Sequence, residues 1–185
     1  MKAKGSALVP LREFVLKKFG EQGQQQWLAA LPPASRQIHE QPLLTSCWYP
    51  FIDGFLVPVE QMCRLFYKGD PRGAWEFARY AADTELHTIY KVFVRISTPE
   101  FLMRNAGLII KSYFSDAEIK IVESGRGMMR MRISNVDTPH VLFDHVVGGW
   151  TEQAFEICGC RNLSTSIVQS AVDNREFTEY HIAWE

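Results

Sequence analysis

The second half of the chain switches between helical and strand periodicity in a regular order. Apolar residues recur at steps of three and four over residues 98–115 and again over 138–158, which predicts two amphipathic helices. After each helix, apolar and polar residues alternate along two short runs, which predicts a hairpin. The expected strands are 118–124, 128–135, 165–171 and 177–184. This αββαββ order predicts an antiparallel sheet with both helices on one face, a layout that can enclose a small-molecule pocket.

The first half is predicted to be helical. Pro10 stands at a helix start, apolar positions follow as far as Phe19, and Gly20 predicts a stop. Shorter helices are expected at 24–31, 34–40 and 57–67.

A longer helix is expected after Pro71, and its apolar residues fall on one face. That face consists of Trp75, Ala78, Ala82, Leu86, Ile89 and Phe93. We therefore assign the chain to the α+β class, with a helical layer over residues 1–97 packed on the small antiparallel sheet of residues 98–185. We expect a single domain spanning 1–185.

Two aromatic or glycine-rich segments are candidate pocket elements. Trp48, Tyr49 and Phe51 lie in the segment 42–55, which we expect to be an ordered loop, because so much aromatic surface is rarely left in water. The second expected helix of the αββαββ unit contains Gly148 and Gly149 just before Trp150. Each glycine costs roughly 1 kcal/mol in a helix. The pair indicates a close backbone approach, a kink or room for a ligand, and ordinary core packing is the alternative for both segments.

The composition excludes some functions. The 185 residues are 46% hydrophobic and 22% charged, with 20 basic and 21 acidic side chains, so the net charge of −1 favours neither nucleic acid nor an anionic membrane as a partner. No apolar run approaches the roughly 20 residues of a membrane span, and no signal peptide is evident. We expect a cytoplasmic protein in which the four cysteines are reduced.

Several short strings, taken together, resemble a known superfamily. They are Pro99-Glu100-Phe101-Leu102, Tyr113-Phe114-Ser115, the strand 118–123, Gly149-Trp150, Phe155-Glu156 and the final Trp184. The pattern is similar to the 4-vinyl reductase and haem-NO-binding superfamily, also described as the ligand-binding fold of NO signalling and Golgi transport, and especially to its deltaproteobacterial members. It covers about residues 98–185, and more loosely the helical first half.

The resemblance implies a helical layer over an antiparallel sheet with a cavity between them. Members of the superfamily bind haem, tetrapyrrole-related or aromatic molecules, or acyl chains, and many are regulatory or adaptor modules. This chain departs from the pattern at two places. Ser170 and Thr178 stand where some members have cysteines, which argues against thiolate ligation. Ala117 stands where a Tyr-x-Ser-x-Arg clamp for haem propionates would place arginine. We therefore predict no bound cofactor and disfavour haem.

Three histidines are candidate ligands. His140 and His145 are about 140° apart on a helix, which is poor geometry for one metal, and capping or packing is the interpretation that we favour. His87 lies at the edge of the apolar face of the long helix. It is either a pocket-facing imidazole, in the extreme an axial haem ligand, or a partly exposed helix residue, which we favour. We predict no metal site.

Two further clusters have ordinary explanations. Cys158 and Cys160 form a C-x-C string, whereas zinc sites use wider spacing and a second ligand pair, so buried thiols are favoured over a redox sensor. The expected charged face of the sheet carries Lys120, Arg126, Arg130 and Arg132. Glu118 and Glu123 can neutralise these cations, so we favour a solvated face over an anion site.

No Ser-His-Asp pattern, phosphate-binding glycine loop or paired-carboxylate motif is present, so we predict that the protein is not an enzyme. The main hypothesis is a cytoplasmic sensory or adaptor module that binds a small apolar or aromatic molecule between helices and sheet. The alternatives are a haem-based sensor of NO or O2, and a protein-interaction module that forms a homodimer or docks a signalling partner. The candidate pocket residues are Trp48, Tyr49, Phe51, His87, Tyr113, His145, Gly149 and Trp150.

Overall fold

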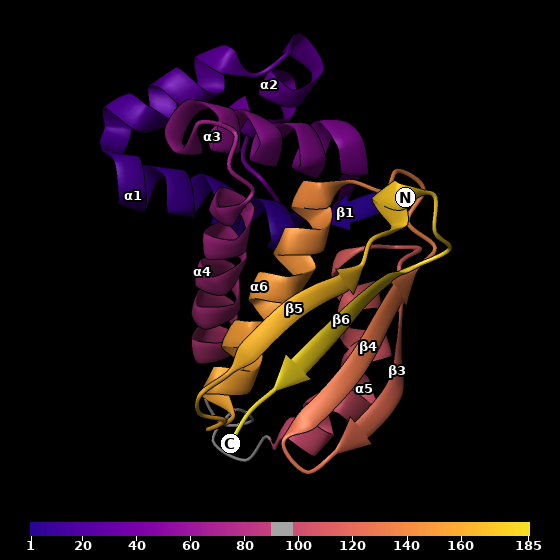
Figure 1. Cartoon of the computed structure of the whole chain (residues 1–185). Helices are drawn as coiled ribbons and strands as arrows, with labels where there is room; N and C mark the ends of the chain where they lie inside the picture. The colour runs from indigo at the N-terminus through magenta and orange to yellow at the C-terminus, as the bar shows by residue number, and fades with distance from the viewer. Residues whose placement is uncertain (90–97) are drawn as a thin grey trace.

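The computed structural model describes residues 1–89 and 98–185, apart from the side chains of residues 87–89. Its N-terminal half is mainly helical, as expected, with one small two-stranded sheet (Figure 1). The elements are β1 (Lys2–Lys4), α1 (Gly5–Ala30), α2 (Pro33–Glu40), β2 (Trp48–Pro50), the π-helical turn η1 (Ile52–Leu56), α3 (Val57–Tyr67) and α4 (Arg72–Ile89). Among the described residues, no helix is both long and apolar enough to cross a membrane.

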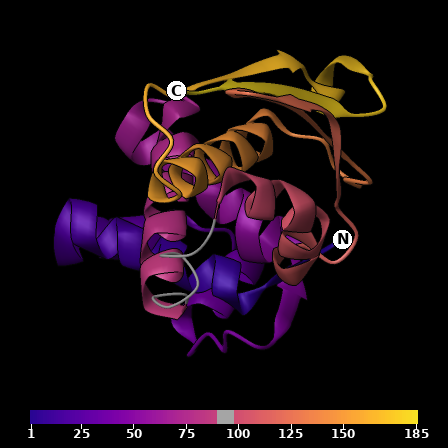
Figure 2. The ribbon, with the colours of Figure 1, turned by 90° about the horizontal axis from the view of Figure 1, so that it is seen from below.

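The C-terminal half has the predicted αββαββ order, and the α+β class is confirmed. Its elements are α5 (Pro99–Tyr113), β3 (Glu118–Gly125), β4 (Met128–Ser134), α6 (Val141–Ile157), β5 (Ser164–Gln169), the 3-10 turn η2 (Ala171–Asp173) and β6 (Thr178–Ala183). The four strands form an antiparallel sheet in the order β3-β4-β6-β5. Both α5 and α6 lie against the same face of this sheet (Figure 2).

The alternation of side chains along the central strands determines which face packs on the helices. Met129, Met131 and Ile133 of β4 are buried, and Met131 pairs with the fully buried Tyr180 of β6. The intervening Arg130 and Arg132 lie on the opposite face. Since successive side chains of a strand point to opposite faces, one face is apolar and the other charged, as the sequence predicted.

The first helix differs from the expectation at both ends. It begins at Gly5, so Pro10 lies inside it rather than at its start, and it continues to Ala30 across Gly20, whose φ of 71° interrupts the helical backbone. The early start depends on a contact distant in sequence. A Cβ on Gly5 would lie 2.0 Å from the Leu44 carbonyl oxygen, so the chain around Leu44 packs directly on this glycine.

The aromatic segment 42–55 and the second helix of the αββαββ unit also differ from the elements that the sequence predicted. Within the segment expected as a loop, β2 pairs with β1 and is followed by η1. Helix α6 begins at Val141 instead of residue 138, because His140 is its N-cap. The imidazole Nδ1 of His140 accepts a hydrogen bond from the Leu142 backbone N–H at 3.1 Å, which satisfies a helix-end donor.

Helices α4 and α6 pack at very short distance through two glycines. A Cβ on Gly149 would lie 2.4 Å from the backbone oxygen of Trp75, and a Cβ on Gly148 would lie 2.4 Å from the Trp75 ring. Of the three explanations offered by the sequence, a close backbone approach is therefore the one that the structure shows. Arg79 adds ion pairs across the same interface, with Glu152 at 2.5 Å and Glu156 at 2.6 Å.

Replacing Gly149 with alanine should destabilise the protein, because the added methyl group collides with backbone atoms of α4. We expect a loss of about 1–3 kcal/mol in the free energy of unfolding, measured by denaturant titration. The matched control is Gly107→Ala on α5, where the new Cβ would meet its nearest atom at 3.5 Å. That variant should gain roughly 0.5–1 kcal/mol from helix propensity. Equal effects of the two substitutions would contradict the packing described for α4 and α6.

Candidate functional site

An apolar cavity of about 80 Å³ lies between α4, α5 and α6 and the strands β3 and β4. Alanines from four helices face it, including Ala7 of α1, and their small side chains leave space that larger ones would fill. The others are Ala78 and Ala81 of α4, Ala106 of α5 and Ala154 of α6. The remaining apolar wall includes Phe55, Leu102, Met103, Ile109, Ile110, Phe114, Ile119, Ile121, Met129, Met131, Val146, Val147 and Phe155.

Four lining side chains carry polar atoms, and three of them meet at one place. The Tyr113 hydroxyl of α5 donates a hydrogen bond to Glu85 Oε2 of α4 at 2.6 Å. Trp150 of α6 lies beside the same carboxyl group, and its side chain, like that of Tyr113, favours the charged form of Glu85. The fourth side chain, Thr151, is satisfied within its own helix, since its hydroxyl donates to the Val147 carbonyl at 2.8 Å.

Glu85 is a buried carboxyl group in an apolar environment. Its side chain is 8% exposed, and no cation is among the described residues that line the cavity. Burial raises the pKa of Glu85 to about 7, and the groups of Tyr113 and Trp150 partly oppose this effect. Because burial disfavours the charged form, this carboxyl group takes up a proton at a higher pH than an exposed glutamate does.

Of the eight candidate pocket residues, Tyr113 and Trp150 line the cavity. The aromatic segment contributes less directly. Trp48 is 42% exposed, with the Lys4 ammonium 5.5 Å from its ring centroid, and the Tyr49 hydroxyl accepts a hydrogen bond from the Leu44 N–H. Phe51 is buried in the core against Phe55, Phe114 and Phe143, so it supports the cavity wall from behind.

Of the other three candidates, Gly149 and His145 do not line the described cavity, and the side chain of His87 is outside the described residues. Gly149 packs against the Trp75 backbone. The Nδ1 atom of His145 is 2.8 Å from the Val141 carbonyl oxygen, and its ring lies 5.9 Å from that of Trp75. Phe93 also lies outside the described residues. The two helical histidines, His140 and His145, are thus occupied in a helix cap and a backbone contact.

Ser170 and Thr178 stand where some members of the resembled superfamily have cysteines. In this chain the two hydroxyl groups meet at the buried carboxyl group of Asp144. The Ser170 hydroxyl donates to Asp144 Oδ2 at 2.6 Å, and the Thr178 hydroxyl donates to Oδ1 at 2.9 Å. Burial raises the pKa of Asp144, and these two hydrogen bonds oppose the increase. The cluster joins α6 to the last hairpin. Within the described residues, no group of three or more histidine, cysteine or acidic side chains could hold a metal ion.

The two remaining clusters have the ordinary roles favoured by the sequence. Burial raises the pKa of Cys158 to about 11, the opposite of what a reactive thiol requires, and all four cysteines are free. On the outer face of the sheet, Arg130 pairs with Glu123 at 3.1 Å and with Glu179 at 2.7 Å. Arg132 pairs with Glu179 at 2.5 Å. These cations are therefore neutralised rather than arranged for an anion.

Comparisons with known proteins identify the fold. No protein-family model matches the chain, and no curated protein matches it. Among solved structures, an H-NOX protein from K. algicida, described as Fe(II) unliganded, matches with a TM-score of 0.72 and 11% identity, covering 98% of this chain and 96% of that one. An H-NOX protein from S. oneidensis in the Fe(II)NO state matches with a TM-score of 0.76 and 12% identity over 98% and 99%.

A Shewanella oneidensis H-NOX domain in the Fe(II)CO state is also similar, with a TM-score of 0.72 and 12% identity over 98% of each chain. This chain therefore has the H-NOX fold along nearly its whole length, including the helical first half. The haem-NO-binding side of the predicted resemblance is confirmed at the level of the fold.

The comparison corrects the prediction that no cofactor is bound and that haem is disfavoured. That prediction is wrong, because the solved proteins with this fold are described in iron ligation states. The prediction also gave too much weight to a single interaction. It depended on one charged contact, at Ala117, whereas a macrocycle would be held mainly by burial of apolar surface, which contributes roughly 25 cal/mol per Å².

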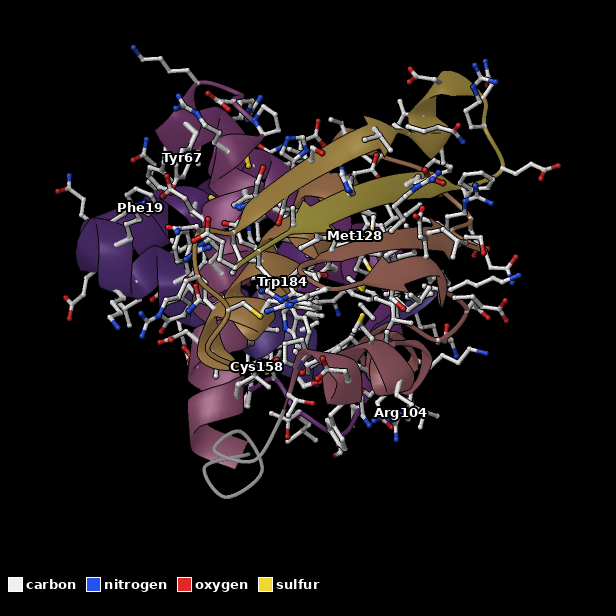
Figure 3. The ribbon with its side chains drawn as sticks, turned by 60° about the horizontal axis from the view of Figure 1, so that its bottom comes forward. Phe19, Tyr67, Arg104, Met128, Cys158 and Trp184 are labelled. Carbon is white, nitrogen blue, oxygen red and sulfur yellow. The ribbon has the colours of Figure 1, made fainter. Side chains whose placement is uncertain are left out.

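The described residues can be tested against haem directly. The cavity wall is apolar, and α5 contributes Tyr113 and Met103, both residue types that ligate haem iron in proteins. No described lining residue is a cation for the propionates, because Ala117 is fully buried and Arg104 lies on the outer face of α5 (Figure 3). The residue types of the wall thus suit the apolar faces of a macrocycle and offer side chains that can ligate iron. The present 80 Å³ is below the roughly 300–1,000 Å³ of typical ligand pockets, so the walls would have to separate.

Sequence reasoning missed Glu85, although a signal was present. The residue follows Ala78 and Ala81 at steps of seven and four, so the three share one face of α4. An acidic residue on the small-residue face of an amphipathic helix is unusual, because burial of an unpaired charge is costly. The adjacent apolar stripe through Ala82 and Leu86 is the stronger pattern on this helix.

The raised pKa of Glu85 predicts how stability depends on pH. Between its ordinary value of 4.5 and about 7, the folded state binds more protons than the unfolded state, so the contribution of Glu85 to stability falls as pH rises. Glutamine cannot titrate. The stability of Glu85→Gln relative to the natural chain should therefore increase across this range, by at most about 1.4 kcal/mol per pH unit, in denaturant titrations at pH 5, 6, 7 and 8.

A matched control variant should show the opposite change of relative stability with pH. The Thr98 hydroxyl lowers the pKa of Glu100, so Glu100→Gln should lose relative stability as pH rises through the acidic range. If the difference between Glu85→Gln and the natural chain were independent of pH, the assignment of a buried, titrating carboxyl group would be wrong.

Proposed function

We propose that this chain is a non-catalytic sensory domain that binds haem in the α4–α5–α6 cavity and responds to a diatomic gas. The observation that carries the proposal is the match, over 98% of the chain, to H-NOX proteins described with Fe(II) alone and with NO. The apolar lining of the cavity supports it. Bound haem would supply an iron atom that takes the gas as a ligand.

The chain's own residues would hold the group and exclude water from it. Leu102 and Ile109 of α5 and Met131 of β4 belong to the apolar wall that would contact a macrocycle. The described lining side chains of haem-ligating type are Tyr113 and Met103 of α5 and Met129 and Met131 of β4. Helix α4 packs most extensively on α6, and α5 packs on β3, so the cavity lies between two pairs of elements. A change of occupant would move one pair relative to the other.

Haem binding is tested by absorption spectroscopy of the purified chain, before and after addition of haem. We expect a Soret band that shifts when the reduced sample is exposed to CO. The variant Ala81→Phe, which fills the cavity, should lose the band, whereas Ala29→Phe on the exposed surface of α1 should retain it. Circular dichroism checks that both variants fold. A folded natural chain that remains colourless in the presence of haem would exclude the proposal.

A second candidate is a sensory module that takes a small molecule directly in the same cavity. The specific observation in its favour is Glu85, a polar group facing a space of about 80 Å³ that suits a molecule of a few heavy atoms. Native mass spectrometry of the purified chain separates the two candidates, since haem and a smaller occupant add different masses.

Several finer expectations belong to the same proposal. A cytoplasmic location is supported by four free cysteines. A single domain over residues 1–185, a place in the 4-vinyl reductase or deltaproteobacterial branch, and a homodimer or signalling partner as the output all remain proposals. Of these proposals, the homodimer is the easiest to test, because light scattering coupled to size-exclusion chromatography measures the oligomeric state.

A further inference from the structure

One edge of the four-stranded sheet lacks charged side chains. The strand order β3-β4-β6-β5 makes β3 and β5 the edge strands (Figure 1). The edge strand β3 carries Glu118, Lys120 and Glu123, and such charges discourage pairing with another chain. In contrast, residues 162–172, which include β5, contain no charged side chain. The β5 edge is therefore the one suited to pairing with a further strand.

Backbone hydrogen bonds show which groups of β5 are already used. Glu185, just after β6, and Arg161, just before β5, donate to each other's carbonyl oxygens at 2.9 and 3.2 Å. Since the backbone groups of an antiparallel strand point alternately to its two neighbours, the odd-numbered residues of β6 face β5. Their partners in the register are Ser164 and Ser166. These two serines thus use their backbone groups within the sheet.

The residues that alternate with these serines, Thr165 and Ile167, direct their N–H and C=O groups away from the sheet. Among the described residues, no other strand pairs with these groups. The register shift in β5 comes after Ile167, so both residues lie in regular strand. Beyond them, Val168 and Val172 are 55% and 46% exposed. An incoming strand would thus find unpaired backbone groups and apolar side chains together.

We propose that β5 is a dimerisation edge, at which the strand pairs antiparallel with β5 of a second copy of this chain. With the two-fold axis at Ser166, Thr165 of each copy lies opposite Ile167 of the other. The same backbone groups then bond in both directions, as an isologous contact requires. The two sheets become one continuous sheet. No described residue of β5 lines the cavity between α4, α5 and α6, so the inference goes beyond the proposed function and does not depend on haem.

Charge favours a second copy as the occupant of this edge. An antiparallel pair brings the beginning of one strand beside the end of the other. Arg161, just before β5, therefore approaches Asp173 of the second copy, which follows the end of its strand, and this occurs at both ends of the pair. Both side chains are exposed. Between them, residues 162–172 place no like charges opposite each other.

The dimer should be weak, because one strand pair buries less than the roughly 800 Å² per partner of a standard interface. The test is sedimentation of the full chain at concentrations from about 10 µM to about 1 mM, a range suited to a dissociation constant on the order of 100 µM. We expect the measured mass to rise with concentration from that of one chain toward that of two.

Charged variants at the two-fold axis locate the interface. Ser166→Lys and Ser166→Glu each place like charges opposite one another, so each variant alone should associate roughly fivefold more weakly than the natural chain. An equimolar mixture of the two should associate again, because opposite charges then meet. The matched control is Ser124→Lys on the edge strand β3, which should associate as the natural chain does. Circular dichroism checks that each variant folds.

Each other outcome overturns the proposal. If the natural chain has the mass of one chain at every concentration, the β5 edge serves another partner or none. If Ser166→Lys associates as the natural chain does, or if Ser124→Lys weakens association equally, the interface is not centred on β5. Ser166→Lys should bind haem as the natural chain does, so failure of this proposal and failure of the proposed function are measured separately.

Discussion

The contact between α4 and α6 is the constraint on which the rest of the structure depends. Gly149 allows the α6 backbone to approach the Trp75 backbone more closely than a residue with a Cβ could, and Gly148 leaves room for the Trp75 ring. Arg79 then joins the two helices through Glu152 and Glu156. Because this pair is fixed, the cavity is bounded by a rigid wall on one side, and α5 with β3 forms the other.

The same contact between α4 and α6 also positions the polar side chains of the cavity. It positions Trp150, the residue after the glycine pair, beside Glu85 of α4, and Tyr113 reaches the same carboxyl group from α5. A buried acid in an apolar wall disfavours its charged form, so it is retained at a cost in stability above its unfolded-state pKa. Stability alone would favour an apolar side chain at this position.

Local patterns predicted much of this fold and little of the site. Period-two alternation from Met129 to Ile133 was sufficient to orient the sheet, because burial of one face depends only on neighbours along a strand. The start of α1 at Gly5 could not be predicted, since it depends on the distant Leu44 backbone. The meeting of Glu85, Tyr113 and Trp150 depends on how three helices cross, and no spacing in the sequence records that. The fold match to H-NOX proteins, in turn, is the basis for proposing haem, which single-residue reasoning at Ala117 had disfavoured.

The central claim is that the cavity between α4, α5 and α6 contains a carboxyl group that is neutral over part of the physiological pH range. The most direct test is a ¹³C NMR titration of glutamate side-chain carboxyl groups, with the Glu85 resonance assigned by its loss in a Glu85→Gln spectrum. The account predicts a midpoint near 7. A midpoint at the ordinary value of about 4.5 would show that Glu85 is in contact with water and would contradict the account.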